Sequence, residues 1–323
     1  MHKILLTCPP MIGMVEAFEE DFKKAAFDVN IPEFTQEMSE DALCEIIGDY
    51  DGWIIGDDPA TRRVLEAGTR GRLKACMRWG VGTNNVDFAA FEEFQIPIEN
   101  TPGVFGREVA DLACHYVTAL ARETFTINDQ VKQGNWHKPV GQSLWSASAL
   151  IVGFGDIGQN LAKRLLAHDM KVNFVDPFVS QSQAGPSVTK VTWPHSLSHV
   201  DYVIFTAPLN DSTYHMLNFD NVELAKKGIK LVNVGRGPLI SENALVKGLK
   251  EGYIASAALD VFEIEPFNRE IHSDLVQFSD KLILGSHNGS NTKEAVEYVS
   301  RLCVERLSNF LTAGISSDAS NKD

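Results

Sequence analysis

The 323-residue sequence lacks the features of a membrane, nucleic-acid-binding or exported protein. No apolar run reaches the roughly 18 residues that a membrane-spanning helix needs. The apolar run at the start of the chain is too short for a signal peptide, and we predict that it forms a strand that ends at two prolines. Basic residues number 29 against 43 acidic ones, a net charge of −14, so we expect neither nucleic acid nor a membrane surface as partner.

Cysteine is also scarce. The five cysteines lie far apart in the chain, and none forms a Cys-x-x-Cys motif. This pattern predicts free thiols in a reducing compartment, and we expect a cytoplasmic protein.

Several catalytic motifs are missing as well. There is no G-x-x-x-x-G-K-[ST] motif, which disfavours a nucleotide triphosphatase, and no Tyr-x-x-x-Lys, which argues against the short-chain dehydrogenase mechanism. His195 and His199 have the spacing of a helical metal clamp, but no third ligand stands nearby and the zincin glutamate is absent. We therefore expect no metal.

The strongest motif present is an apolar strand over residues 149–153 that continues into G-x-G-x-x-G. Gly153 suits the tight turn, Gly155 lets the backbone approach a pyrophosphate, and Gly158 lets the next helix pack on the strand. The helix that begins at Asp156-Ile157 directs unpaired N–H groups at the phosphates. Asp176 ends the next strand and suits the ribose hydroxyls, so the cofactor predicted is NAD rather than NADP. The alternative is a purely structural glycine turn.

Strands alternate with helices along most of the chain, which predicts doubly wound α/β sheets, and the length favours two domains. In the first third, the predicted strands are residues 4–7, 52–55 and 73–77, with a helix at 40–48. The later strands, six in number, are residues 150–153, 172–176, 202–206, 230–234, 257–260 and 282–284. Because the glycine motif belongs on the first strand of its domain, an earlier unit must precede it.

The expected crossings between the domains are a turn near residues 100–103, followed by a long helix, and a second point near residues 286–290. Residues 124–148 are too long for a simple connector and are interpreted as an arm that packs on a second subunit. The tail, residues 316–323, is predicted to be disordered.

Three polar residues follow strands in the second half of the chain. Arg236 lies between two glycines, and its planar guanidinium can hold a carboxylate by two parallel hydrogen bonds. Glu265 and His287 follow the next two strands, and a histidine beside a carboxylate suits proton transfer near neutral pH. Because ligands bind beyond the carboxyl ends of parallel strands, these residues predict an active site. The alternatives are a surface ion pair and a structural histidine.

These residues resemble the D-isomer-specific 2-hydroxyacid dehydrogenase family, in particular its phosphoglycerate dehydrogenase branch. The resemblance runs from about Arg78 to about Ala295. The motifs that carry it, in order, are residues 80–87, Asn100-Thr101-Pro102-Gly103, the glycine fingerprint, Asn233-Val234-Gly235-Arg236-Gly237, residues 258–262, Glu265-Pro266 and His287. The chain ends soon after its last predicted helix, so the C-terminal regulatory domain of some relatives is not expected.

The resemblance implies an α/β fold of two doubly wound domains. A flavodoxin-like substrate domain is expected over residues 1–100 and 289–323, and an inserted Rossmann NAD-binding domain over residues 101–288. It also implies a homodimer that forms through the cofactor domain.

The resemblance further assigns roles to single residues. Arg236 holds the substrate carboxylate, helped by the backbone N–H groups of Val81 and Gly82, while His287 is the acid/base and Glu265 its partner. Hydride passes between C4 of the nicotinamide and C2 of a 2-hydroxy or 2-keto acid. Besides the fingerprint and Asp176, the residues implied to line the cofactor are Thr206, Ala207, Pro208, Val234, Asp260 and Gly289.

The substrate is left open between three possibilities. Arg78 and Lys138 match the extra cations that phosphoglycerate dehydrogenases use for the phosphate. Against this, Gly56 stands where that branch often has arginine, and Asp57 and Asp58 after it would repel a phosphate. The alternatives are a glyoxylate or hydroxypyruvate type of reductase and a non-catalytic NAD-sensing protein similar to transcriptional corepressors.

Overall fold

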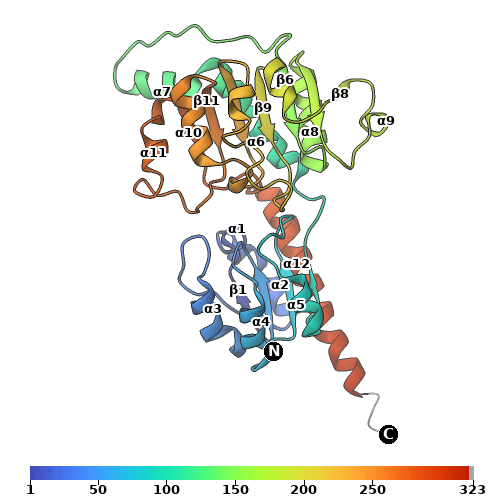
Figure 1. Cartoon of the computed structure of the whole chain (residues 1–323). Helices are drawn as coiled ribbons and strands as arrows, with labels where there is room; N and C mark the ends of the chain where they lie inside the picture. The colour runs from blue at the N-terminus through green and yellow to red at the C-terminus, as the bar shows by residue number, and fades with distance from the viewer. Residues whose placement is uncertain (320–323) are drawn as a thin grey trace. The chain divides into compact units, whose positions relative to one another are not determined.

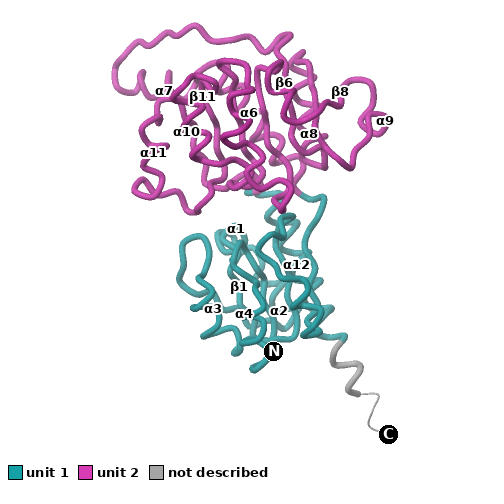
Figure 2. The backbone as a smooth tube through the Cα atoms, viewed as in Figure 1, with its two compact units in different colours: residues 1–104, 291–323 teal, residues 105–290 magenta. Residues whose placement is uncertain are grey.

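The chain divides into two compact units (Figure 2). The computed structural model describes the backbone of residues 1–319 and the side chains of residues 1–313. Unit 1 comprises Met1–Val104 and the chain from Asn291 onward, and unit 2 comprises Phe105–Ser290. The chain therefore leaves and re-enters unit 1 a few residues later than the predicted boundaries. Among the described residues, no helix combines the length and apolar character needed to cross a bilayer.

Unit 1 contains a five-stranded parallel sheet with the order β2-β1-β3-β4-β5, which is the flavodoxin-like order. Figure 1 shows β1 of this sheet among the helices of unit 1. Its strands are β1 (His2–Leu6), β2 (Phe27–Asn30), β3 (Gly52–Ile55), β4 (Ala75–Arg78) and β5 (Ile98–Glu99). Its helices are α1 (Pro9–Ile12), α2 (Glu19–Lys24), α3 (Glu40–Ile46), α4 (Arg62–Thr69), α5 (Phe88–Glu93) and α12 (Lys293–Ala319). Strands β3 and β4 are buried throughout, because helices cover both faces of the sheet.

Unit 2 contains a seven-stranded parallel sheet with the order β12-β11-β10-β9-β6-β7-β8. Counted from β6, this is the Rossmann order with one added edge strand. The strands are β6 (Ser148–Val152), β7 (Lys171–Val175), β8 (Val188–Lys190), β9 (Tyr202–Phe205), β10 (Ile229–Asn233), β11 (Ile254–Leu259) and β12 (Leu282–Leu284). The helices are α6 (Gly106–Arg122), α7 (Thr124–Lys132), α8 (Asp156–Ala167), α9 (Gln181–Ala184), α10 (Glu242–Glu251) and α11 (Ser273–Val276). The predicted two-domain α/β fold is thus confirmed.

The amphipathic helix α6 shows how the sequence assembles unit 2. Val109, Ala113, Tyr116, Val117 and Leu120 recur at helical spacing and are buried. The helix packs on α8 and on strands β10 and β11. This packing places the hydroxyl of Tyr116 beneath the carboxyl ends of those strands, where the predicted site residues lie.

Some elements differ from the sequence-based predictions. Strands β2, β5 and β8 were not predicted, and all three are short edge strands. The predicted arm, residues 124–148, begins with helix α7 and continues as a long loop. In the predicted disordered tail, residues 316–319 form the last turn of α12, because no proline interrupts the helix, and residues 320–323 lie outside the described residues.

Candidate functional site

The glycine fingerprint forms a tight turn between β6 and α8. Gly153 has a φ of +92°, and a Cβ there would lie 2.6 Å from the backbone of Ala207 on the loop after β9. A Cβ at Gly158 would lie 2.3 Å from the carbonyl oxygen of Gly153. A Cβ at Gly155, by contrast, would meet no atom within 4 Å. Two of the glycines are therefore required by packing, and the third faces open space that a ligand can approach.

The N-terminus of α8 has unpaired donors at this turn. No side chain caps the helix at Gly155. Within the part of the chain that the structure describes, the N–H groups of Asp156, Ile157 and Gly158 donate to no protein acceptor. The Asp156 carboxylate lies against Gly106 of α6. Three free donors and the positive end of the helix dipole suit the pyrophosphate of a dinucleotide.

The Asp176 carboxylate follows β7 and bridges two loops. It accepts hydrogen bonds from the backbone N–H of Phe154 (2.7 Å), on the fingerprint turn, and from those of Phe178 (2.8 Å) and Val179 (3.1 Å) on its own loop. The acid predicted for the ribose is therefore fixed beside the phosphate turn. Together with the open space at Gly155 and the free N–H groups of α8, this arrangement fits NAD.

Glu265 and His287 form a direct pair. Nδ1 of His287 lies 2.8 Å from Oε2 of Glu265, and the other carboxylate oxygen accepts the backbone N–H of Phe262 at 3.0 Å. Both side chains are about one-fifth exposed. The pairing fixes the ring through Nδ1, and a carboxylate beside a histidine stabilises the protonated ring.

The buried Asp260 holds the backbone that carries His287. Its carbonyl oxygen accepts the N–H of His287 at 2.7 Å, and its carboxylate accepts those of Asn288 (3.2 Å) and Gly289 (2.9 Å). Tyr116 donates to the same carboxylate at 3.4 Å. His287 itself has a φ of +53°, a left-handed conformation that is unfavourable for its side chain and that these contacts maintain.

The environment of Asp260 also affects its charge. Burial raises the pKa of the Asp260 carboxyl, and the Asn288 N–H donor and His287 oppose this rise. Burial likewise raises the pKa of the Tyr116 hydroxyl, so Tyr116 stays a neutral donor. The resemblance implied that Asp260 lines the cofactor, but in the structure much of its carboxylate is engaged in supporting residues 287–289. Tyr116 was not predicted, and its place in the helical apolar pattern gave no signal of this contact.

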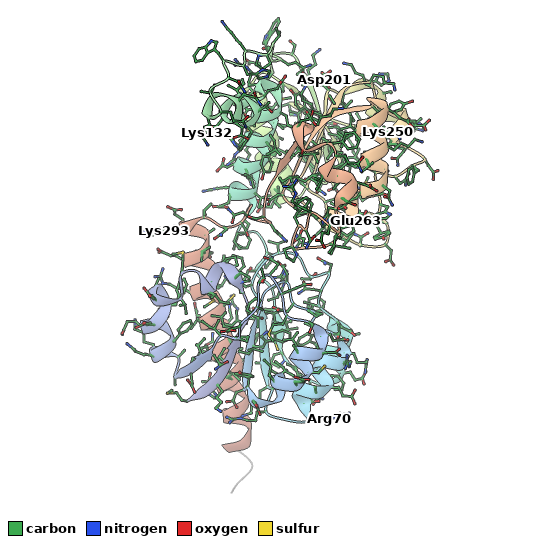
Figure 3. The ribbon with its side chains drawn as sticks, turned by 90° about the vertical axis from the view of Figure 1, so that its left-hand side faces the viewer. Arg70, Lys132, Asp201, Lys250, Glu263 and Lys293 are labelled. Carbon is green, nitrogen blue, oxygen red and sulfur yellow. The ribbon has the colours of Figure 1, made fainter. Side chains whose placement is uncertain are left out.

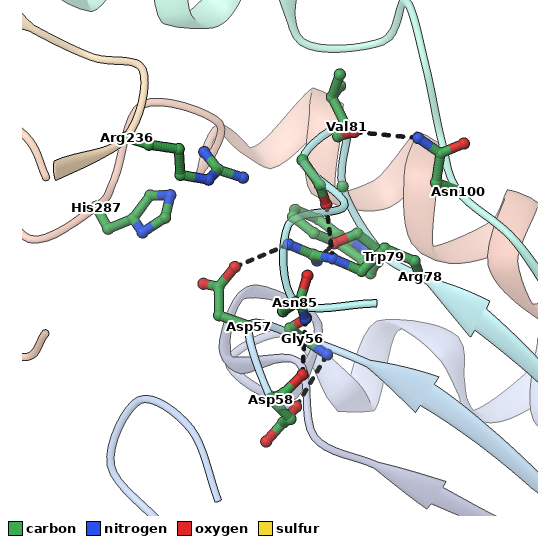
Figure 4. A network of polar contacts seen from close by, with 12 residues as sticks. Gly56, Asp57, Asp58, Arg78, Trp79, Val81, Asn85, Asn100, Arg236 and His287 are labelled. Carbon is green, nitrogen blue, oxygen red and sulfur yellow. Dashed lines mark hydrogen bonds and ion pairs between the residues drawn. The ribbon is translucent and has the colours of Figure 1, made fainter. Parts of the chain in front are cut away.

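Arg236 follows β10 and has a fixed backbone. Nδ2 of Asn233 donates to the carbonyl oxygen of Arg236 at 2.9 Å, and Oδ1 of Asn233 accepts the N–H of Gly235 at 3.1 Å. Nη1 of Arg236 donates to the carbonyl oxygen of Gly235 at 2.9 Å. Strands β10, β11 and β12 are neighbours, so Arg236, Glu265 and His287 come from three adjacent loops at one edge of the sheet. Figure 4 shows Arg236 and His287 on two of these loops.

The remaining predicted cofactor residues lie along the same edge of unit 2. Thr206 donates its hydroxyl to the carbonyl oxygen of Gly153 at 2.7 Å. Ala207 and Val234 are buried, and Pro208 is exposed. The structure thus gathers the predicted cofactor residues around the carboxyl ends of β6, β7, β9, β10, β11 and β12.

Lys138 does not join this edge. It lies in the exposed loop after α7. Further along this loop, Gln142 accepts a hydrogen bond from Lys230, near the start of β10. The backbone N–H of Ser146 donates to the carbonyl oxygen of Asp169, just before β7. These contacts tie the loop to the amino ends of the strands. Figure 3 shows the two edges of unit 2, with Asp201, before β9, at one and Glu263, after β11, at the other. Within its own unit, Lys138 is therefore at the edge opposite Arg236.

Arg78 of unit 1 is buried, with 3% of its surface exposed, and its donors are engaged (Figure 4). Nε donates to the carbonyl oxygen of Gly82 at 3.0 Å, Nη1 donates to that of Trp79, and Nη2 pairs with Asp57 at 2.8 Å. The guanidinium therefore shapes the loop after β4 and binds an acid of its own unit. Asp57, on the loop after β3, was predicted only as a source of repulsion.

The loop that Arg78 supports presents two free donors. Val81 is exposed, and its carbonyl oxygen accepts Nδ2 of Asn100 at 3.1 Å. Over the described chain, the N–H groups of Val81 and Gly82 have no protein acceptor. Two adjacent N–H groups of this kind suit a carboxylate.

The predicted histidine pair is not part of a larger ligand cluster within the described residues. His195 and His199 begin and end a short 3₁₀ segment, and residues 1–313 contain no cluster of three His, Cys, Asp or Glu side chains that could hold an ion.

Comparison with known proteins identifies relatives over both units. Residues 114–289 match the family model described as "D-isomer specific 2-hydroxyacid dehydrogenase, NAD binding domain". A hydroxypyruvate reductase of Thermotoga maritima is 33% identical over 84% of this chain and 89% of its own. A chloroplastic D-3-phosphoglycerate dehydrogenase of Arabidopsis thaliana is 32% identical over 88% of this chain and only 48% of its own, so the chain spans about half of that relative.

Solved structures agree on the fold. A D-lactate dehydrogenase of Aquifex aeolicus, determined with NAD and lactic acid, has a TM-score of 0.82 over 98% of this chain and 96% of its own, at 21% identity.

Proposed function

Because this chain belongs to the D-isomer-specific 2-hydroxyacid dehydrogenase family, we propose that Arg236, Glu265 and His287 are its catalytic residues. The protein is an NAD-dependent oxidoreductase that acts on the CH–OH group of 2-hydroxyacids. When bound, the coenzyme would supply the acceptor for the hydride of C2 of the hydroxy acid, or in its reduced form the hydride for the keto acid. The observation that supports the assignment most directly is the 2.8 Å contact between Glu265 and His287. This pair lies at the same edge of the sheet as the glycine fingerprint, beyond the carboxyl ends of the strands.

His287 moves the proton in this proposal. In reduction, Nε2 of the protonated ring donates to the carbonyl oxygen of the keto acid as negative charge develops there, and in oxidation the neutral ring accepts the hydroxyl proton. Glu265 keeps the ring oriented through Nδ1 and stabilises its positive charge. The left-handed backbone at residue 287, held by Asp260, directs the ring.

Arg236 orients the substrate in this proposal. Its guanidinium binds the substrate carboxylate, which lies next to the reacting carbon, and so fixes that carbon for hydride transfer. We assign unit 1 as the substrate domain and unit 2 as the NAD-binding domain. The free N–H groups of Val81 and Gly82 support this assignment because two adjacent donors suit the carboxylate of a small acid. A crystal structure with a 2-hydroxyacid should place its carboxylate within hydrogen-bond distance of both N–H groups.

We further propose that the substrate is a small, unphosphorylated 2-keto acid of the hydroxypyruvate class. A phosphate needs free cations, but Arg78 is buried and paired with Asp57, and Lys138 lies at the other edge of its unit. Asp57 also accepts Nε2 of Gln36 at 3.2 Å. A phosphate beside this acid would face like-charge repulsion rather than a binding site.

A comparison of substrates tests this proposal. We expect kcat/KM with NADH to be greater for hydroxypyruvate or glyoxylate than for 3-phosphohydroxypyruvate, on the order of tenfold or more, since about 1.4 kcal/mol of repulsion suffices for that ratio. Asp57→Asn should reduce the ratio, because it removes the acid and releases Arg78. Asp49→Asn, at an exposed acid before β3, is the matched control. A preference for the phosphorylated acid would overturn the proposal, and tight NADH binding without any turnover would favour an NAD sensor.

We also propose a homodimer formed through unit 2. Helix α7 has no buried residue, and the loop after it exposes Trp136 (86%), Val140 (96%) and Trp145 (73%). Large apolar side chains this exposed mark a surface that another protein covers. A second copy of the chain is the occupant proposed. Light scattering should give twice the 35.7 kDa of one chain, and Trp136→Ser with Val140→Ser should shift the mass toward the monomer.

A reducing cytoplasm is the location we propose, because all five cysteines, which lie within the described residues, are free. Microscopy of the tagged protein in its own cell would test this location.

A further inference from the structure

We propose that Glu242 and Glu263 form a reciprocal brace that positions Glu265, and through it His287, for proton transfer. The inference rests on the proposed roles of Glu265 and His287. Glu263 lies two residues before Glu265, on the loop after β11, and Glu242 is the first residue of α10. Neither belongs to the predicted catalytic set.

Each of the two glutamates binds the backbone of the other. The N–H of Glu242 donates to Oε1 of Glu263 at 2.7 Å, and the N–H of Glu263 donates to Oε1 of Glu242 at 2.9 Å. This exchange ties the loop after β11 to the N-terminus of a ten-residue helix. Because each carboxylate satisfies a free N–H of the other segment, neither segment can shift without breaking both hydrogen bonds.

Two histidines accompany the carboxylates. Nε2 of His215 lies 3.2 Å from Oε1 of Glu263, and Nε2 of His272 lies 3.7 Å from Oε1 of Glu242. His272 is 3% exposed, and its ring stacks on Phe267 at a centroid distance of 4.7 Å. Within residues 1–313, neither Nε2 meets the geometry of a hydrogen bond. The side chain of Ser241 already caps α10 by accepting the N–H of Ala244, so the like-charged pair with a histidine at each end indicates a role beyond helix capping.

The brace is continuous with the catalytic loops. The backbone N–H of Phe262 donates to Oε1 of Glu265. The N–H of the next residue, Glu263, donates to Oε1 of Glu242. A Cβ at Gly237 would lie 1.8 Å from the carbonyl oxygen of Phe262, so the residue after Arg236 packs backbone to backbone on this loop. Loss of the brace would therefore displace Glu265 from His287. Glu242 acts through this loop and touches neither substrate nor cofactor in the proposal.

Kinetics of two substitutions at one position test the brace. Glu242→Ala removes the acceptor for the N–H of Glu263, and kcat for keto-acid reduction should fall by about 10- to 100-fold, because small displacements of catalytic groups have effects of this size. Glu242→Gln keeps an oxygen acceptor and should retain kcat within about threefold. The KM for the keto acid and the Kd for NADH should change little in either variant. Ser241→Ala is the matched control, since it removes the side-chain cap of the same helix and should lower Tm without changing kcat.

A double-mutant cycle separates positioning from general destabilisation. If Glu242 acts through Glu265, then Glu242→Ala should have little further effect on kcat in a Glu265→Gln background, whereas an independent structural effect would multiply. Multiplying effects, or unchanged kcat in Glu242→Ala, would overturn the brace. Unchanged kcat in Glu265→Gln alone would instead overturn the proposed role of Glu265. If Glu242→Ala fails to fold, Glu263→Ala removes the other half of the brace and should reproduce the fall in kcat.

Discussion

His287→Ala is expected to lower kcat for keto-acid reduction by about 10³-fold or more, while the Kd for NADH stays within about twofold. General acid catalysis by a positioned side chain commonly contributes on the order of 10²–10⁴-fold. The ring lies beyond β12, away from the fingerprint turn and Asp176, so its removal leaves the predicted contacts to the dinucleotide intact. Stopped-flow or steady-state absorbance of NADH gives kcat, and quenching of protein fluorescence gives Kd.

Two further variants sharpen this test. Glu265→Gln keeps a hydrogen-bonding side chain but removes the charge that stabilises the protonated ring, so the pH above which reduction slows should move to a lower value. His199→Ala, at a histidine outside the proposed site, should leave both constants unchanged. If His287→Ala weakens NADH binding as much as it lowers kcat, His287 supports the cofactor site rather than the chemistry.

Arg236→Ala is expected to reduce kcat/KM for the keto acid on the order of 10²–10⁴-fold, with little change in NADH affinity. Hydrogen bonds to charged groups contribute about 1.5–3 kcal/mol each, and two such bonds to a carboxylate would be lost. Kinetics over a range of keto-acid concentrations measure the effect.

The pattern of rescue distinguishes orientation from simple charge attraction at this arginine. Arg236→Lys keeps the charge but loses the planar fork, so it should recover only part of kcat/KM. Arg269→Ala, at an exposed arginine on the loop after Glu265, is the control that should behave as the unaltered protein. Full recovery by lysine would contradict bidentate binding.

The cofactor half of the site could be predicted because its chemistry depends on local spacing. Gly153, Gly155 and Gly158 each have a mechanical role within six residues of chain, and Asp176 ends the adjacent strand. The residues after β10, β11 and β12 could also be predicted, since the ends of parallel strands meet at one edge. Strands β2, β5 and β8 were missed because short strands at a sheet edge have little apolar pattern.

The substrate half could not be predicted to the same depth. The sequence shows Arg78, but its pairing with Asp57, an acid 21 residues earlier, depends on how the loops after β3 and β4 fold. The course of the loop that carries Lys138 likewise depends on its contacts with Lys230 and Asp169. The Glu242–Glu263 brace could not be predicted from a sequence motif, because each of its side chains accepts a backbone N–H group of a distant segment.

Asp176 also limits how the coenzyme preference could be redesigned. Its carboxylate satisfies three backbone N–H groups, one of them on the fingerprint turn, which is the proposed site of the pyrophosphate. Exchange for a small apolar residue, intended to admit the extra phosphate of NADP, would leave those donors without an acceptor and loosen the turn that both coenzymes need. A useful redesign has to retain an oxygen acceptor at this position and supply its new cation from elsewhere on the loop.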